Sequence, residues 1–312
     1  MSVASSDWRR LYPFESHYLQ LKCGSRLHYV DERPSPDPPE GRNALRVSEA
    51  KALAPCVLAV HGNPTWSFYY RTMIRELRDS HRSIAVDHLG MGLSDKPQSY
   101  PYCLASHTDN LVSLIETLDL RNIVMVVHDW GGAIGLGAAT RCVERMAGLV
   151  VLNTAAFPPP YVPFRISILK LPWVGRLAMT HGNVFARAAT KMTLNRLTTL
   201  EPDVRDGLMA PYDSPANRIG IASFVQDIPL SSAHPTYRVL SQLEMQLAQL
   251  THLPIHLVWG MKDWCFRPTC LEKFRSVWPN ADCLELDDVG HYVMEESPGD
   301  VIRQVRSIIA TV

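Results

Sequence analysis

The chain has 312 residues, of which 46% are hydrophobic and 20% are charged, enough for one large domain or a domain with an insertion. Lys plus Arg and Asp plus Glu both number 31, so the net charge is zero. This balance argues against a nucleic-acid or anionic-membrane partner and favours a small neutral ligand.

The composition also bears on location and on metals. The first 16 residues lack an apolar run of signal-peptide length, and no segment has the roughly 20 apolar residues that span a bilayer. The seven cysteines are dispersed and lack metal-ligand spacing, which predicts free thiols in a reducing compartment. We therefore expect a cytoplasmic protein with neither a metal nor a cofactor.

The first half of the chain predicts alternating strands and helices. Residues 17–30 predict a β-hairpin, and residues 32–54 an exposed connection with one helical turn near 47–53. Residues 67–78 have helical spacing, with Ser67 as N-cap. Further buried strands are expected at 56–60, 83–87, 123–127 and 148–152, and a further helix at 104–118. This alternation predicts an α/β fold with a mostly parallel central sheet flanked by helices.

The alternation stops after the sixth strand. Residues 157–230 show no convincing buried strand, but helical stretches occur at 164–177 and 183–194. They predict a helical cap over the carboxyl edge of the sheet, where open α/β sheets bind ligands. The expected division is therefore a core of 1–156 and 231–312 with a cap of 157–230. In the second core part we expect helices at 237–250, 268–277 and 298–310, and strands at 255–259 and 282–286.

Asp129 occupies the centre of the most informative motif. The strand 123–127 runs into a sharp turn, and Gly131 and Gly132 open a helix of small residues. This is the strand–turn–helix pattern of a nucleophile elbow, in which Ser usually takes the central place. A carboxylate that attacks a saturated carbon forms an ester that water can open, whereas serine would form a stable ether. Asp129 therefore predicts displacement at a saturated carbon rather than acyl transfer.

Two residues after later strands can complete a catalytic triad. His291 follows the predicted strand 282–286 and has the chemistry to activate water against the ester. Asp263 follows strand 255–259 and could orient the imidazole. The chain order Asp129, Asp263, His291 is the nucleophile–acid–base order of α/β-hydrolases.

Asn63 and Trp130 are the candidate anion-binding residues. Their backbone N–H groups occupy the positions of an oxyanion hole, and their side chains add an amide and an indole donor for a departing halide.

The chain resembles the haloalkane dehalogenases, a family of α/β-hydrolases, from about residue 17 onward. In that family the elbow Asp displaces halide, a His activates water, and an Asn–Trp or Trp–Trp pair holds the halide. The matching strings are HGNPTWSFYYR (61–71), DHLGMGLSDKP (87–97), VVHDWGGAIG (126–135), APYDSPANRIGIASFVQDIPL (210–230), WGMKDW (259–264) and DDVGHYVMEESP (287–298).

The position of the catalytic acid narrows the resemblance. One branch of the family places a Glu after the strand that here ends at Leu152, where this chain has Asn153-Thr154. Asp263 with Asn63 and Trp130 instead resembles subfamily III, with an Asp–His–Asp triad and an Asn–Trp halide pair. Trp173 in the cap is a rival halide donor, as in the branch that uses two tryptophans.

The primary expectation is hydrolytic dehalogenation of an apolar haloalkane to alcohol, halide and a proton. The subfamily is also similar to β-lactone decarboxylases of olefin biosynthesis, which use the same residues. An epoxide hydrolase, with Tyr161 and Tyr212 as proton donors, is a weaker alternative, and a ligand-binding relic of the fold is the non-enzymatic one. The sequence leaves open whether the chain forms a homo-oligomer.

Overall fold

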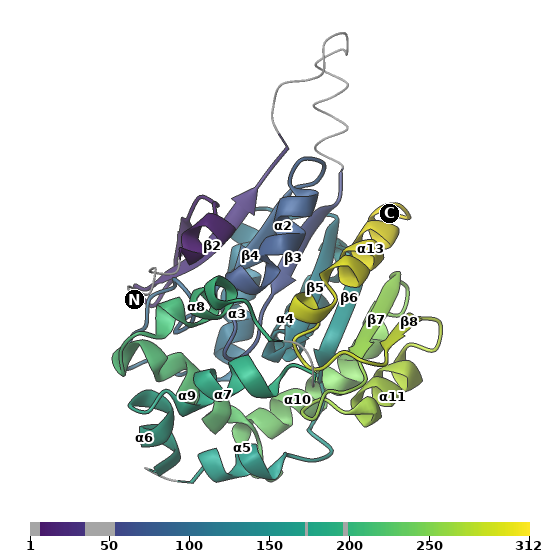
Figure 1. The fold of residues 1–312 in the computed structure, drawn as a ribbon. Helices are drawn as coiled ribbons and strands as arrows, with labels where there is room; N and C mark the ends of the chain where they lie inside the picture. Colours follow the sequence, from purple (N-terminus) through teal and green to yellow (C-terminus); the bar gives the residue numbers. More distant parts are fainter. Residues whose placement is uncertain (1–6, 35–53, 172–173, 196–198) are drawn as a thin grey trace.

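The computed structural model describes residues 7–34, 54–171, 174–195 and 199–312 (Figure 1). Its centre is an eight-stranded sheet with the order β1-β2-β4-β3-β5-β6-β7-β8. The strands are β1 (His17–Gln20), β2 (Arg26–Glu32), β3 (Cys56–Val60), β4 (Ser83–Val86), β5 (Ile123–Asp129), β6 (Met146–Thr154), β7 (Ile255–Gly260) and β8 (Asp282–Leu286).

The sheet is parallel from β4 to β8 and antiparallel at one edge. β1 and β2 form the predicted hairpin, and β2 pairs antiparallel with β4. β3 to β7 are buried almost throughout, which explains their continuous runs of β-branched and other apolar residues. The predicted mostly parallel α/β sheet is confirmed.

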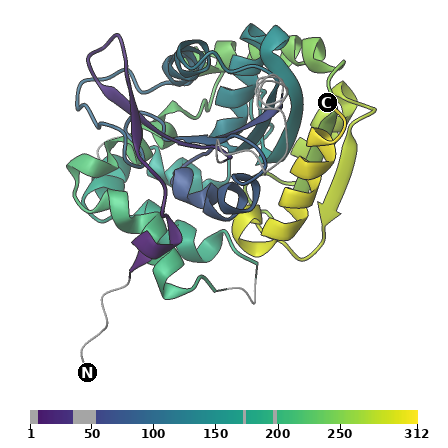
Figure 2. The ribbon, with the colours of Figure 1, turned by 90° about the horizontal axis from the view of Figure 1, so that it is seen from above.

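Helices cover both faces of the sheet. On one face, α4 packs on β3, β5 and β6, and α3 and α10 pack against α4. On the other face, which is toward the viewer in Figure 1, α13 packs on β5, β6 and β7, and α2 lies beside α13. Figure 2 shows the same layers from above. The helices are α2 (Arg71–Leu77), α3 (Leu104–Thr117), α4 (Trp130–Arg141), α10 (Pro235–Gln246), α11 (Pro268–Val277), α12 (Val293–Glu296) and α13 (Pro298–Ile309).

Between β6 and β7 the described chain forms only helices and connections, at the lower end of the molecule in Figure 1. Before α10, the helices of this stretch are α5 (Phe164–Leu169), α6 (Val174–Thr180), α7 (Val184–Met192), α8 (Pro202–Met209) and α9 (Ile219–Asp227). The expected helix 164–177 is thus two helices, and α8 and α9 were not predicted. The helical insertion after the sixth strand is confirmed, whereas the domain boundaries at 157 and 230 stay a prediction.

Short 3-10 helices account for other local differences. They are η1 (Trp8–Leu11), η2 (Ser67–Tyr70), η3 (Val143–Arg145), η4 (Ala210–Tyr212), η5 (Ala216–Arg218) and η6 (Leu247–Leu250). Ser67 was wrongly predicted as an N-cap: it is the first residue of η2, which precedes α2. Its N–H donates to Asp87 and its hydroxyl pairs with Tyr12, so tertiary partners decide its place. The helical turn expected near 47–53 lies outside the described residues.

Two composition-based expectations have structural counterparts. All seven cysteines are free thiols, four of them exposed or half-buried. No helix among the described residues is both long and apolar enough to cross a bilayer.

Gly131 is a sensitive point of the fold, because α4 starts against β3. A Cβ atom at Gly131 would lie 2.1 Å from the backbone oxygen of Val60, so the helix would have to move away from the sheet. We expect Gly131→Ala to lower the free energy of unfolding by about 1–3 kcal/mol. Denaturant titration measures this change.

Gly299→Ala in α13 is the matched control, since its added Cβ atom would meet only ordinary contacts. It should be neutral, or stabilising by up to about 1 kcal/mol. Equal losses in both variants would contradict the close approach at Gly131.

Candidate active site

Asp129 lies at a strained turn between β5 and α4. Its φ of 53° is in the left-handed region, which residues other than glycine seldom adopt. The backbone oxygen of Asp129 accepts a hydrogen bond from the hydroxyl of Thr154 on β6. Gly62 leaves room on the other side, since a Cβ atom there would lie 2.1 Å from Oδ1 of Asp129. The turn therefore holds the carboxylate above the sheet edge, as expected for a nucleophile elbow.

The structure brings Asp129, His291 and Asp263 together. Nδ1 of His291 lies 2.8 Å from Oδ2 of Asp263, and Nε2 lies 3.5 Å from Oδ2 of Asp129. All three residues are buried. One imidazole thus lies between two carboxylates that come from the ends of different strands, the geometry that the triad hypothesis requires.

The two carboxylates determine the protonation of the imidazole. Burial alone would lower the pKa of His291, but the charge of Asp263 and the hydrogen bonds to Asp129 and Asp263 outweigh it and raise the pKa to about 10. Burial would likewise raise the pKa of Asp129, but the hydrogen bond and charge of His291 lower it. The site at neutral pH therefore holds an ionised Asp129 beside an imidazolium.

Several supporting contacts were not predicted from the sequence. Oδ1 of Asp263 accepts the backbone N–H of Cys265 at 2.6 Å. The backbone N–H of His291 donates to the carbonyl of Thr193 at 2.7 Å, immediately after α7. Nε2 of His128 lies 2.8 Å from the carbonyl oxygen of His291. Burial lowers the pKa of His128 to about 3, so this imidazole is neutral. His128 directly precedes the elbow Asp in the sequence, which is the one signal that could have identified it.

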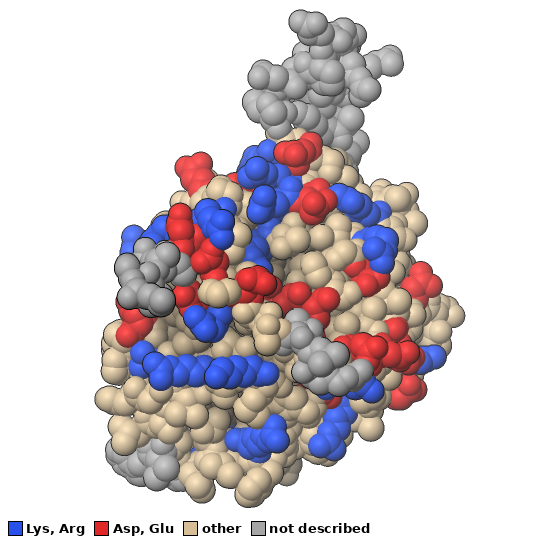
Figure 3. All heavy atoms as spheres, viewed as in Figure 1, with Lys and Arg blue, Asp and Glu red and all other residues tan. Residues whose placement is uncertain are grey.

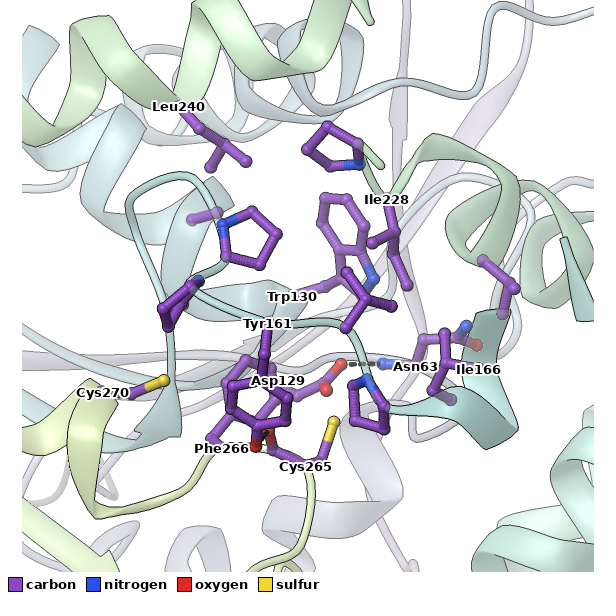
Figure 4. A pocket seen from close by; sticks show the side chains of 18 of the residues that line it. Asn63, Asp129, Trp130, Tyr161, Ile166, Ile228, Leu240, Cys265, Phe266 and Cys270 are labelled. Atoms are coloured by element: carbon purple, nitrogen blue, oxygen red, sulfur yellow. Dashed lines mark hydrogen bonds between the residues drawn. The ribbon is translucent and has the colours of Figure 1, made fainter. Parts of the chain in front are cut away.

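Asn63 and Trp130 flank the Asp129 carboxylate. The backbone N–H of Asn63 donates to Oδ1 of Asp129 at 2.7 Å (Figure 4). Its side-chain amide donates to the carbonyl of Ile221 in α9 at 3.1 Å, which leaves one amide hydrogen for another acceptor. Within the described part of the chain, the indole N–H of Trp130 donates no hydrogen bond. The predicted anion-binding roles stay predictions, but both side chains line the same pocket as Asp129.

The pocket above Asp129 is almost entirely apolar. It contains about 820 Å³ of empty space, its mouth included, and Asp129 is the one charged residue among those that line it. Figure 4 shows Leu240 and Cys270 on one side of Asp129 and Ile166 and Ile228 on the other. The lining residues are Asn63, Asp129, Trp130, Ala133, Ala155, Phe157, Pro159, Pro160, Tyr161, Val162, Pro163, Ile166, Phe185, Val225, Ile228, Pro229, Leu240, Cys265, Phe266 and Cys270.

The structure gives less support to the other candidate site residues of the sequence analysis. The hydroxyl of Tyr161 donates to the carbonyl of Cys265, and that of Tyr212 donates to the carbonyl of Thr65. Both hydroxyls are thus engaged by backbone, which weakens the epoxide hydrolase alternative. Trp173, the rival halide donor, lies outside the described residues. Over the described ranges, no group of three His, Cys, Asp or Glu side chains could hold a metal ion.

Comparison with known proteins agrees with this architecture. Residues 55–298 match the protein family described as alpha/beta hydrolase fold. The chain is 36% identical to a cis-3-alkyl-4-alkyloxetan-2-one decarboxylase of Shewanella oneidensis, over 95% of this chain and 88% of that protein. It is 31% identical to haloalkane dehalogenase 2 of Mycobacterium tuberculosis, over 96% of both chains.

Solved structures show the same fold. The haloalkane dehalogenase DbeA from Bradyrhizobium elkani superposes with a TM-score of 0.81 at 23% identity, over 96% of this chain and 98% of that one. The chain therefore belongs to the alpha/beta hydrolase fold family, among the relatives that include haloalkane dehalogenases and oxetanone decarboxylases.

Proposed function

We propose that this protein decarboxylates a cis-dialkyl β-lactone, the four-membered ring that chemical nomenclature calls an oxetan-2-one. The observation that carries the proposal is the 36% identity with the Shewanella oneidensis decarboxylase over 95% of the chain, against 31% with the haloalkane dehalogenase. The comparisons thus favour the alternative of the sequence analysis over its primary expectation of dehalogenation.

The pocket supports an uncharged substrate with two apolar arms. Asp129 lies between two apolar regions, one containing Leu240 and Cys270 and the other Ile166 and Ile228 (Figure 4). A cis-dialkyl lactone carries one chain on each of two neighbouring ring carbons. With the ring at Asp129, each chain would enter one region and transfer its surface out of water, at about 25 cal/mol per Å².

The chemistry begins at Asp129. Its carboxylate attacks the saturated ring carbon that bears the ring oxygen, the carbon–oxygen bond breaks, and the ring opens to a carboxylate on the neighbouring carbon. The bond to this carboxylate then breaks to release carbon dioxide. Its electron pair forms the double bond and expels Asp129 from the other carbon, which regenerates the enzyme without water. Inversion followed by anti elimination converts the cis lactone into the cis alkene.

The surroundings of Asp129 suit both steps. The carboxylate produced by ring opening resembles a halide as a departing anion, and the indole of Trp130 and the free amide hydrogen of Asn63 are available to it. The imidazolium of His291 offsets the negative charge of the site. The apolar walls then leave the new carboxylate poorly solvated, which favours the loss of carbon dioxide because the charge disperses in that step.

Haloalkane dehalogenation is the second candidate, because it would use the same three residues, Asp129, Asp263 and His291. Displacement of halide would form an alkyl ester on Asp129 and remove its negative charge. With one of its two carboxylate partners neutralised, the pKa of His291 should fall, so the imidazole becomes a base when water must be activated.

The first test compares substrates on one preparation. We expect alkene and carbon dioxide from a cis-dialkyl β-lactone to form faster than halide from 1-bromobutane, and Asp129→Ala to abolish both reactions because it removes the nucleophile. Gas chromatography and a halide assay give the two rates. Asp109→Ala, which changes an exposed carboxylate on α3, is the control and should retain activity. Halide release with an inert lactone would overturn the proposal.

Turnover in water labelled with heavy oxygen separates the two routes. Hydrolysis of an alkyl ester places a water oxygen in the carboxylate of Asp129, whereas direct elimination returns the carboxylate with its own oxygens. After many lactone turnovers, the peptide containing Asp129 should therefore keep its mass. A mass gain with the lactone would contradict the elimination step, while a gain with a haloalkane is expected.

The protonation of His291 can be measured directly. We expect its imidazole to titrate well above the roughly 6.5 of an unfolded histidine and to titrate lower in Asp263→Asn, which removes the charge that most raises the pKa. The raised pKa stabilises the fold fully below about pH 6.5, and this stabilisation is lost as the pH rises toward 10. NMR titration and unfolding at several pH values test both statements. An unchanged titration in Asp263→Asn would contradict the coupling.

A further inference from the structure

Positive charge is concentrated in one part of this neutral chain. Between Arg145 and Glu201 there is no Asp or Glu, although the whole chain has 31 of them. The same stretch contains six basic residues, which are Arg165, Lys170, Arg176, Arg187, Lys191 and Arg196. The zero net charge therefore conceals a basic segment that includes α5, α6 and α7.

The structure leaves most of this charge unpaired. Arg165, Arg176, Arg187 and Lys191 are exposed, and within the described ranges none of them forms an ion pair with an acidic side chain. Lys170 differs, because its amine donates to the carbonyls of Val225 and Gln226. Over the lower part of the molecule, where α5 and α7 lie, Figure 3 shows blue among tan atoms. The cap thus presents cations to the outside.

The same helices expose apolar side chains. In α5 and the residue pair after it, Phe164, Ile168 and Leu171 follow the spacing of one helix face and are 78%, 44% and 52% exposed. Ile166, on the opposite face, is buried and lines the pocket. α5 packs against α6 and α6 against α7. α6 adds the exposed side chain of Leu177, and α7 adds those of Val184 and Met192.

We propose that this face, formed by α5, α6 and α7, docks on a bilayer that contains anionic phospholipid. Exposed apolar residues and cations on helices that themselves contain no acidic residue are the pattern of helices that lie in a membrane interface. The cations are attracted by acidic headgroups, and the apolar side chains enter the boundary between headgroups and acyl chains.

The location of the face gives the docking a purpose. α5 separates the outer face from the pocket, since Ile166 points inward and Phe164 and Ile168 point outward. A substrate with two alkyl chains, as in the proposed function on which this step rests, would partition into lipid. Docking through α5 would place the pocket beside that lipid, so the substrate could reach Asp129 without crossing water.

Vesicle flotation tests the docking without any substrate, so its result is independent of the lactone activity. The wild-type protein should float with phosphatidylcholine vesicles containing about 30% phosphatidylglycerol, more weakly at high salt, and poorly with phosphatidylcholine alone. The triple variant Phe164→Ser/Ile168→Ser/Leu171→Ser and the double variant Arg187→Gln/Lys191→Gln should each bind at least about tenfold more weakly.

The matched controls lie outside the face. Met245→Ser removes an apolar side chain that is 74% exposed on α10, and Arg121→Gln removes an exposed cation near β5, so both should bind like wild type. Thermal melting and turnover of a short-chain substrate verify that every variant is folded. The proposal would be overturned if the wild-type protein failed to float with any of the vesicles. It would also be overturned if the variants of the face floated as well as wild type. Self-association that depends on Phe164 without vesicle binding would also overturn it, in favour of a protein contact.

Discussion

A single imidazole between two buried carboxylates is the interaction on which the rest of the site depends. Removing one partner of such a buried group typically costs about 3–5 kcal/mol, so the surrounding structure must hold all three groups in place. The strained backbone of Asp129, the Cys265 N–H on Asp263 and the Thr193 carbonyl behind His291 do so. The sheet supplies the frame, because parallel strands end at one edge and bring residues distant in sequence together.

Features determined by local sequence were predictable. The order of strands and helices followed from hydrophobic periodicity, and Asp129, Asp263 and His291 follow β5, β7 and β8 closely enough that strand order alone placed them together. The cap was harder to predict, because α5 and α6 are short and prolines punctuate the segment, so periodicity does not locate their ends. The second partner of Asn63, the Ile221 carbonyl, comes from α9 and depends on how the cap packs.

Charge shows a related limit of sequence-wide averages. A net charge of zero led to the expectation of no membrane partner, yet the basic residues of the cap have no acidic residues near them in the sequence. Likewise, the candidate catalytic groups do not distinguish a dehalogenase from a lactone decarboxylase, since Asp129 begins both of the proposed reactions. The distinction lies in the leaving group and the fate of the covalent intermediate, and hence in the apolar walls, many of which belong to the cap.

The hydrogen bond from the His291 backbone to the Thr193 carbonyl ties the histidine loop to the end of α7. Glu296 adds to this tie through the backbone N–H groups of Gly290 and Asn195. Any outward swing of α7 that widens the pocket would pull on the loop that carries the imidazole. A wider pocket and the alignment of His291 with Asp129 and Asp263 would then oppose each other, so the width of the pocket and the geometry of the candidate triad are mechanically coupled.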